Sequence, residues 1–357
     1  MEKQDAIINA HIACERAIDE LRRQMGIIVQ HDNKQTAAFP VEYIVEALLA
    51  GFRSPAANCK LLITATRARS IGLDPSDASA IVTDAGNLTL AQIMALADPL
   101  ADQKELPKVT FTPASTAMQM MLKLAKFASN LPAMLLIEGD AMPDSWLKIS
   151  DSDMELYIRE PLIDIVPTAV ASLPLLGAET TTIRSFRACY GTAVHLALMI
   201  GTIAPGASPL VRIHSSCVTG DILGSLRCDC GDQLKLALSE IGKAGGGILI
   251  YLHQEGRGIG ITNKLRAYRL QEQGFDTYEA NLLLGFEEDE RDFSIAAAIL
   301  KKLGHKRIRL LTNNPLKITA LEQSGISITE RVPLIVETGR HNHAYLEPKS
   351  KKAGHLF

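Results

Sequence analysis

The chain has 357 residues, more than one hydrophobic core usually organises, so two domains are the default expectation. Hydrophobic residues make up 47% of the chain and charged residues 22%, proportions that are ordinary for a soluble globular protein. The net charge of -3 at pH 7 argues against a general nucleic-acid-binding protein, although a local basic pocket for a small anion stays allowed.

Segment 1–21 alternates charged and apolar residues at helical spacing and lacks the apolar core of a signal peptide. No run elsewhere approaches the roughly 20 apolar residues that span a bilayer, so we expect a cytoplasmic protein without a membrane segment. Cytoplasmic cysteines are more often reduced, metal-bound or catalytic than disulfide-bonded. Of the six cysteines, Cys14, Cys59 and Cys189 stand alone and are interpreted as buried, inert thiols.

Residues 1–165 alternate helical and strand patterns, which predicts an α/β (α+β) domain with a mixed sheet and packed helices. Residues 98–107 are polar and contain proline, so we expect a surface loop there. Helices are expected at 4–24, 40–50 and 117–128, and strands at 27–29, 61–64 and 134–137.

Segment 166–182 has two prolines, several threonines and no helical period, which predicts a linker or domain entry. A second α/β domain with a mixed sheet is expected at 170–340, followed by a flexible tail at 341–357. Its strands are expected at 195–202, 248–252 and 307–311, and its helices at 232–243, 263–273, 289–303 and 315–323.

Three cysteines fall close together, with ten residues between Cys217 and the pair Cys228 and Cys230. The cysteines of such a pair rarely bridge each other, but both thiolates can turn toward one soft metal. Four protein ligands mark a structural zinc and three plus water a catalytic one, and His214 or Asp229 could supply a fourth ligand. The cysteines therefore predict a metal site, which could be either structural or catalytic. Three cysteines packed in a core is the plainer alternative, which the polar, glycine-rich surroundings disfavour.

The segment HQEGRGIG, residues 253–260, follows an apolar strand pattern. Its glycines let backbone N–H groups approach an anion closely, and Arg257 can bind a phosphate in a bidentate way. A tight turn with a solvated Glu–Arg pair would explain the same residues.

Two further segments could also meet an anion. In DERDF, residues 289–293, the dipole of the expected helix accounts for the acidic residues but not for Arg291. In TNNPLK, residues 312–317, Thr312 or an asparagine can cap a helix whose N–H donors suit a phosphate, and Lys317 adds a charge. Ordinary capping is enough to explain the asparagines, but less so the lysine.

In this order the segments resemble GTP cyclohydrolase II, an enzyme of riboflavin biosynthesis. The resemblance covers residues 205–338, and more weakly back to about 170. Its motifs are RIHS, CVTGD, SLRCDCG, QEGRGIG, NKLRAY, YEAN, LGF, LLTNNP and ERVPLIV.

The resemblance implies a GTP cyclohydrolase II-like fold with one zinc held by Cys217, Cys228 and Cys230. It implies hydrolysis of GTP to formate, pyrophosphate and a ribosylated diaminopyrimidine phosphate, with zinc activating the water. A magnesium ion on the triphosphate and a homodimer are expected as well.

The resemblance also assigns roles by position. Asp289 matches the proton acceptor, and Arg291 matches the nucleophile toward the α-phosphate. Because a guanidinium stays protonated at neutral pH, stabilising charge in the transition state is the alternative role for Arg291. The positions that contact GTP are matched by Arg212, Gln233, Glu255, Gly256, Arg257, Tyr268, Thr277, Thr312 and Lys317.

Two residues depart from the family pattern. Ser216 stands where a glutamate usually precedes the first cysteine, and His253 stands where an arginine usually precedes QEGR. Losing a charged group could weaken nucleotide or metal binding by a few kcal/mol. Altered efficiency is expected, and the alternative is a catalytically impaired or regulatory homologue that keeps the zinc and the nucleotide pocket.

Residues 1–165 resemble a degenerate 3,4-dihydroxy-2-butanone 4-phosphate synthase, through AIDELRRQMGIIVQHD, ITATRARSIGL and ASTAMQMMLKLAKFASNLPAMLLIEG. That synthase needs a carboxylate-rich loop for magnesium and proton abstraction, but here Asp32 is the only carboxylate of HDNKQTAAF. Residues 114–117 replace its Gly-His-Thr-Glu segment, and Glu138 alone cannot run the reaction. We therefore predict no synthase activity, and a role in dimerisation, folding or regulation.

Overall fold

The computed structural model describes residues 2–32, 34–53, 57–139, 143–161, 164–188 and 192–334. The chain forms two compact units, the first comprising Met1–Leu162 with Thr262–Glu290 and the second Ile163–Ile261 with Arg291–Phe357. A segment from the second half of the chain is thus part of the first unit, which the sequence patterns did not indicate. Cys189 and the expected tail at 341–357 lie outside the described residues. Among those residues, no helix combines the length and apolarity that crossing a bilayer requires.

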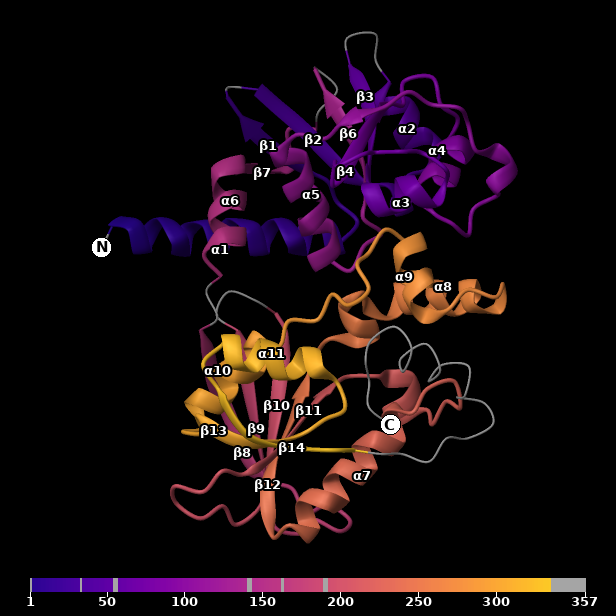
Figure 1. Ribbon diagram of the computed structural model, residues 1–357. Helices are drawn as coiled ribbons and strands as arrows, with labels where there is room; N and C mark the ends of the chain where they lie inside the picture. Colours follow the sequence, from indigo (N-terminus) through magenta and orange to yellow (C-terminus); the bar gives the residue numbers. More distant parts are fainter. Residues whose placement is uncertain are drawn as a thin grey trace. The chain divides into compact units, whose positions relative to one another are not determined.

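The first unit is built on a mixed sheet whose strands follow the order β5-β4-β3-β6-β2-β1-β7. Figure 1 labels all of these strands except β5. Its pairs are antiparallel except for β1 and β7, which are parallel. The strands are β1 (Ile27–His31), β2 (Lys34–Pro40), β3 (Asn58–Thr64), β4 (Ala80–Asp84), β5 (Thr112–Pro113), β6 (Ala133–Glu138) and β7 (Leu147–Ser150).

Helices cover both faces of this sheet, and the strands are apolar on both sides as a result. On β3, Leu62 packs into the core beneath α1, α5 and α6, whereas Leu61 and Ile63 pack into the core on the other face with α2 and α4. The helices are α1 (Glu2–Arg22), α2 (Glu46–Phe52), α3 (Ala65–Ser70), α4 (Leu90–Ala97), α5 (Thr116–Phe127), α6 (Asp151–Arg159), α8 (Gly260–Glu272) and α9 (Thr277–Leu283).

Most expected elements of this unit are confirmed within a few residues, but the helix expected at 40–50 is wrong. Pro40 ends strand β2 instead of opening a helix, and α2 begins only at Glu46. Residues 37–40 are buried and pair with β6, so their contacts in the core decide the conformation over local propensity. The loop expected at 98–107 is confirmed, with one short 3₁₀ turn at Gln103–Glu105.

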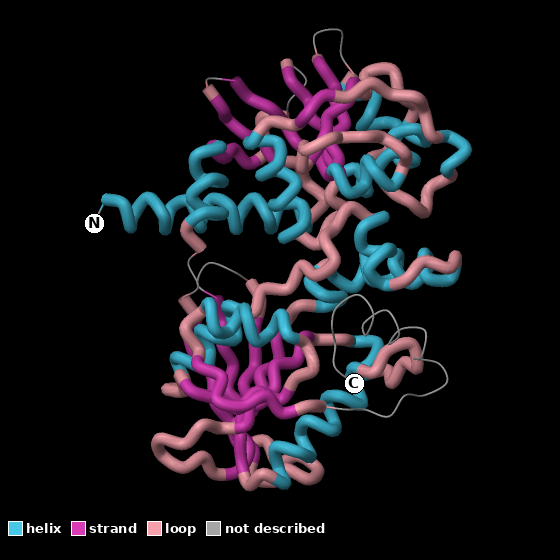
Figure 2. Tube along the Cα trace, viewed as in Figure 1, coloured by secondary structure: helices cyan, strands magenta, loops and turns pink. Residues whose placement is uncertain are grey.

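The second unit also contains a mixed sheet, in the order β14-β13-β11-β12-β10-β9-β8, which Figure 2 shows in magenta between cyan helices. Its strands are β8 (Ile165–Ser172), β9 (Thr181–Ala188), β10 (Val194–Gly201), β11 (Leu210–Ser215), β12 (Gly246–Leu252), β13 (Arg307–Leu311) and β14 (Ser327–Val332). Strands β12, β11, β13 and β14 run parallel, whereas β8, β9, β10 and β12 pair antiparallel.

Helices again pack on both faces of this sheet. Helix α7 (Cys230–Lys243) buries Ala237 and Ile241 on one face, while α10 (Ser294–Lys302) and α11 (Pro315–Gln323) cover the other. Because β11, β12 and β13 are parallel, their carboxyl ends meet at one edge, which is where open α/β sheets usually bind ligands.

Two expectations for this unit are corrected. The segment expected at 166–182 to be a linker or domain entry does lie near the start of the second unit, but it is not a plain linker. Its first part belongs to β8, which pairs antiparallel with β9, and pairing rather than a local pattern decides this strand. The helix expected at 289–303 begins only at Ser294, whose backbone N–H is taken up by the Asp292 carboxylate. The dipole argument therefore holds for Asp292, which accepts the first backbone N–H of the helix, but not for Asp289 and Glu290, which lie further from its start.

Candidate metal centre and its surroundings

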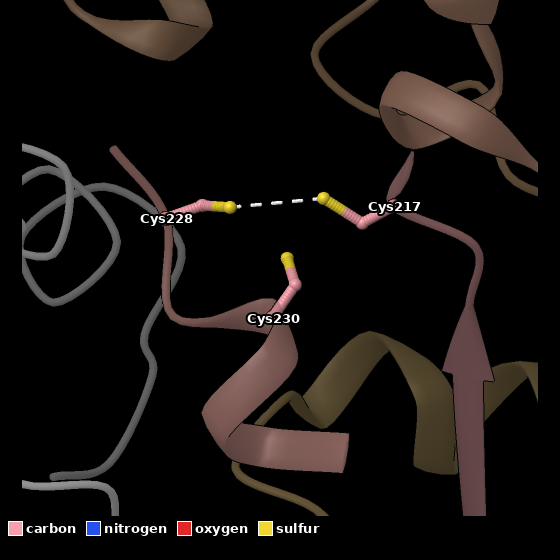
Figure 3. Close-up of side chains that lie close together, drawn as sticks. All are labelled: Cys217, Cys228 and Cys230. Carbon is pink, nitrogen blue, oxygen red and sulfur yellow. Dashed lines mark hydrogen bonds between the residues drawn. The ribbon is translucent and has the colours of Figure 1, made fainter. Parts of the chain in front are cut away.

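Three cysteine sulfurs converge at the carboxyl end of β11 (Figure 3). Cys217 follows the strand and precedes a π-helical turn at Val218–Ile222, Cys228 lies in the loop beyond, and Cys230 opens α7. The sulfurs of Cys217 and Cys228 are 3.7 Å apart, and all three lie within 4.8 Å of one another. Among the described residues, this group alone has the spacing that could hold a metal ion.

The spacing fits a tetrahedral metal. Zinc–sulfur bonds of about 2.3 Å place two sulfurs about 3.8 Å apart around a tetrahedral zinc, close to the observed separation. Hydrogen bonding to Cys217 raises the pKa of both Cys228 and Cys230, which reflects how closely the three sulfur donors are held together. The donor set therefore suits a soft divalent ion.

Two glycines make the close approach of the three cysteines possible. A Cβ on Gly220 would lie 2.8 Å from the Cys228 sulfur and 3.2 Å from the Cys217 sulfur. A Cβ on Gly231 would lie 2.3 Å from the Gly220 carbonyl oxygen. Larger residues would thus force the loop and α7 apart.

Asp221 braces the loop that carries Cys217. Its carboxylate accepts the Cys217 backbone N–H at 3.0 Å and the Tyr251 hydroxyl at 2.8 Å. The His214 Nε2 atom faces the same carboxylate at 3.0 Å, and the His214 ring stacks on Tyr251. His214, one candidate for a fourth ligand, is thereby turned to Asp221 and lies outside the cysteine group.

Asp229, the other candidate, accepts a hydrogen bond from Gln233 at 2.5 Å. Gln233 in turn accepts from Arg212 at 2.6 Å, so two residues predicted to bind GTP are in direct contact. Alternation along β11 points Arg212 toward α7. Burial lowers the pKa of Arg212 to about 10, which leaves it protonated at neutral pH, and its Nε atom is buried without a hydrogen-bond partner.

The turn after β12 contacts the metal loop through Glu255. This carboxylate accepts the Val218 backbone N–H at 2.7 Å and the Gly256 N–H at 3.0 Å. Gly256 and Arg257 both adopt left-handed backbone angles, with φ of 64° and 62°. For an arginine this conformation costs about 1 kcal/mol, and such strain gathers at functional sites.

Two more cations, Lys317 and Arg291, lie in the segments that follow β13 and precede α10. Thr312 follows β13, and Lys317 on α11 is buried and donates to the Ile213 carbonyl at 2.9 Å. The Phe293 ring lies 5.4 Å from the Lys317 ammonium and 5.1 Å from the Arg291 guanidinium. Arg291 also contributes to lowering the pKa of Arg212, so the three cations share one neighbourhood.

The remaining predicted residues belong to the first unit. Tyr268 lies on α8, with the Lys264 ammonium 5.8 Å from its ring. Thr277 opens α9 and accepts a hydrogen bond from Gln271 at 3.1 Å, and Asp289 follows that helix. Their roles stay predictions.

The two departures from the family pattern lie beside the turn after β12. The Ser216 hydroxyl accepts the Gln254 backbone N–H at 3.2 Å, and the His253 backbone N–H donates to His195 Nδ1 at 3.1 Å. Burial lowers the pKa of His195 to about 4, with His253 adding to the shift.

Sequence reasoning missed Asp221 and Tyr251 as supports of the metal loop. Asp221 sits four residues after Cys217, a spacing that returns a side chain to the same side of a helical turn. The spacing was a usable signal for Asp221. Tyr251 comes from a different strand, so no local pattern could have found it.

Comparisons with known proteins support the same region. The family model for GTP cyclohydrolase II matches residues 168–333. A GTP cyclohydrolase-2 from Azospirillum brasilense is 37% identical over 361 residues, covering 97% of this chain and 94% of that protein. A GTP cyclohydrolase-2 from Histophilus somni is 58% identical over 163 residues, 46% of this chain and 76% of that protein.

Riboflavin biosynthesis protein RibBA from Bacillus subtilis is 56% identical over 164 residues, and the matched part is 41% of its length. Among solved structures, RibBX from A. baumannii, described as a two-domain 3,4-dihydroxy-2-butanone 4-phosphate synthase, is 16% identical. It covers 91% of this chain and 99% of its own, with a TM-score of 0.33.

Proposed function

The chain belongs to the GTP cyclohydrolase II family, and we propose that it hydrolyses GTP to formate, pyrophosphate and a ribosylated diaminopyrimidine phosphate, the first step of riboflavin biosynthesis. The observation that carries the proposal is the cysteine group beside three cations, Arg212, Arg291 and Lys317, in the second unit. Cations held in a partly desolvated site bind a triphosphate through charge-assisted hydrogen bonds.

Zinc is the ion that we assign to Cys217, Cys228 and Cys230. When bound, it supplies a water activated at neutral pH and a Lewis acid for opening the imidazole ring. The chain's own part is to fix the ligands. The Asp221 carboxylate holds the Cys217 backbone, and the Glu255 carboxylate holds the next residue.

We assign Arg291 to stabilising charge on the α-phosphate during pyrophosphate release. Its guanidinium rests on the Phe293 ring near Lys317, a placement that suits a fixed cation better than a nucleophile. Asp289 is proposed as the proton acceptor. The other proposed contacts to GTP are Gln233, Glu255, Gly256, Arg257, Tyr268, Thr277 and Thr312. Magnesium on the triphosphate, a homodimer and a cytoplasmic location belong to the same proposal.

The second candidate is a regulatory homologue that binds zinc and nucleotide without turnover. Ser216 favours it, because a hydroxyl bonded to the Gln254 backbone stands where the family carries a carboxylate. The test is to incubate the purified protein with GTP and magnesium, and to follow formate release and the pyrimidine absorbance. One zinc per chain without hydrolysis of GTP would favour the regulatory homologue over the enzyme.

For residues 1–165 we propose the absence of synthase activity. Glu138 is already occupied, because its carboxylate forms an ion pair with Lys60 at 2.9 Å and accepts from Asn58 at 3.4 Å. Ser115, in the replaced segment, caps α5. A cation on the surviving carboxylate opposes metal binding there. Substantial turnover of ribulose 5-phosphate would contradict this proposal.

A further inference from the structure

The segment Thr262–Glu290 is fastened to the rest of the first unit at its beginning by Arg266. This guanidinium pairs with the Glu42 carboxylate at 2.8 Å and with the Asp98 carboxylate at 3.5 Å. The side chains of Glu42 and Asp98 are only 4% and 11% exposed. Asn263, fully buried, accepts from Arg266 and donates to the Ser129 carbonyl at 2.8 Å. Removing one partner of such a pair leaves a desolvated charge behind.

The middle of the segment Thr262–Glu290 contacts the rest of the first unit through its own backbone at Leu283 and Gly285. The buried Arg67 side chain lies 3.5 Å from the Leu283 carbonyl at the end of α9. Gly285 follows with φ of 86°, and a Cβ there would lie 2.7 Å from the Thr64 hydroxyl and 3.0 Å from Pro132. The close approach therefore depends on a residue without a side chain.

The end of the segment is held by Lys126 on α5. Its ammonium pairs with the Glu290 carboxylate at 2.7 Å and lies 5.8 Å from the ring of the fully buried Phe286. Glu290 directly follows Asp289 in the chain. The side chains of Phe286 and Glu290, on either side of the proposed proton acceptor, are thereby both in contact with Lys126.

These anchors lie on either side of Tyr268, Thr277 and Asp289 in the chain. They offer a role for the first unit that does not depend on synthase activity. We infer that the first unit is a positioning domain for GTP hydrolysis, in which Glu42, Asp98 and Lys126 hold α8, α9 and the following residues in their working conformation. The inference rests on the proposed function, because it uses the roles assigned to those three residues. Anchors at three points restrict the segment to one conformation, so less ordering remains to be done when GTP binds.

The experiment compares Glu42→Gln and Lys126→Gln with two matched controls in full-length, zinc-loaded protein. Glu155→Gln removes an exposed carboxylate of the same unit, and Lys123→Gln removes an exposed lysine of the same helix as Lys126. We expect kcat/KM for GTP to fall about tenfold in the two anchor variants and to stay unchanged in the controls. Zinc content should stay at one per chain, while amide hydrogen exchange should quicken within 262–290.

A double-mutant cycle adds a readout that general destabilisation would not give. If Glu42 acts through Arg266, then Glu42→Gln combined with Arg266→Gln should lose no more activity than the more damaging single change. Additive losses would overturn the inference. Anchor variants with the kinetics of their controls would also overturn it, as would faster exchange spread over the second unit together with loss of zinc.

Failure of the proposed function has a different signature. If the unaltered protein has no GTP turnover, the hydrolase proposal fails, and the positioning role for that reaction fails with it. Hydrogen exchange in 262–290 needs no activity and would still report whether Glu42 and Lys126 fasten the segment.

Discussion

Substituting Asp221 by asparagine should loosen zinc without unfolding the second unit. The carboxylate lies between three donors or potential donors: the Cys217 backbone N–H, the Tyr251 hydroxyl and the His214 Nε2 atom. Asparagine has the same shape but only one acceptor oxygen, and its amide nitrogen would face at least one of these groups.

The magnitude follows from that mismatch. A buried donor left without an acceptor costs about 1–3 kcal/mol, and the Cys217 N–H belongs to the residue that carries a metal-binding sulfur. If the loop moves to relieve the mismatch, the Cys217 sulfur moves with it, and the zinc is then bound in a less favourable geometry. The expected result is zinc bound about 10–100-fold more weakly, the range measured for second-sphere supports of metal ligands in general.

The assay is competition for zinc against a chromogenic chelator, with the thermal midpoint measured on the same samples. Asp232→Asn is the matched control, because Asp232 is an exposed carboxylate in the first turn of α7. Equal zinc affinity in Asp221→Asn and Asp232→Asn would refute the reasoning that Asp221 sets the position of Cys217.

Three further outcomes are expected. Cys228→Ser should deplete zinc and abolish ring opening, and retained activity with full metal would contradict the ligand assignment. Arg291→Ala should slow pyrophosphate release by about tenfold or more while zinc content stays unchanged, and an equal loss of metal would point to misfolding. Burial holds the pKa of His195 near 4 in the folded protein, so the unfolded chain takes up the proton first as pH falls, and the free energy of unfolding decreases between pH 6.5 and 4. His195→Gln should make this decrease smaller. That difference is worth about 3 kcal/mol at most, and denaturant unfolding curves with identical pH dependence in both proteins would argue against it.

Local patterns predicted the elements that carry a clear signal of their own, either an apolar run or a capping residue followed by proline. Strand β13 and helix α11 have the bounds expected from an apolar run and from a proline after a capping asparagine. Pro40 misled because it also suits the end of a strand, and only the pairing of β2 with β6 decides between the two. Strand β5 has two residues, too few to show a period.

The metal site was predictable because its ligands are concentrated in sequence, whereas its supports are not. Cys217, Cys228 and Cys230 are close along the chain, but Tyr251 reaches the loop from a neighbouring parallel strand. The attachment of residues 262–290 to the first unit was equally invisible. It depends on Glu42 and Lys126, whose partners lie more than a hundred residues away.

The two departures from the family pattern bear on efficiency more than on the existence of the site. Ser216 is uncharged where the family carries a glutamate, but its hydroxyl accepts the Gln254 backbone N–H at the start of the turn that carries Glu255. Glu255 reaches back to the Val218 N–H, so hydrogen bonds connect this turn and the metal loop in both directions. A serine in place of a carboxylate at position 216 therefore removes a negative charge near the cysteines, while the Ser216 hydroxyl and the Glu255 carboxylate hydrogen-bond to the backbone around them. For this reason we expect GTP turnover to persist, with the change appearing in its rate rather than in the zinc stoichiometry.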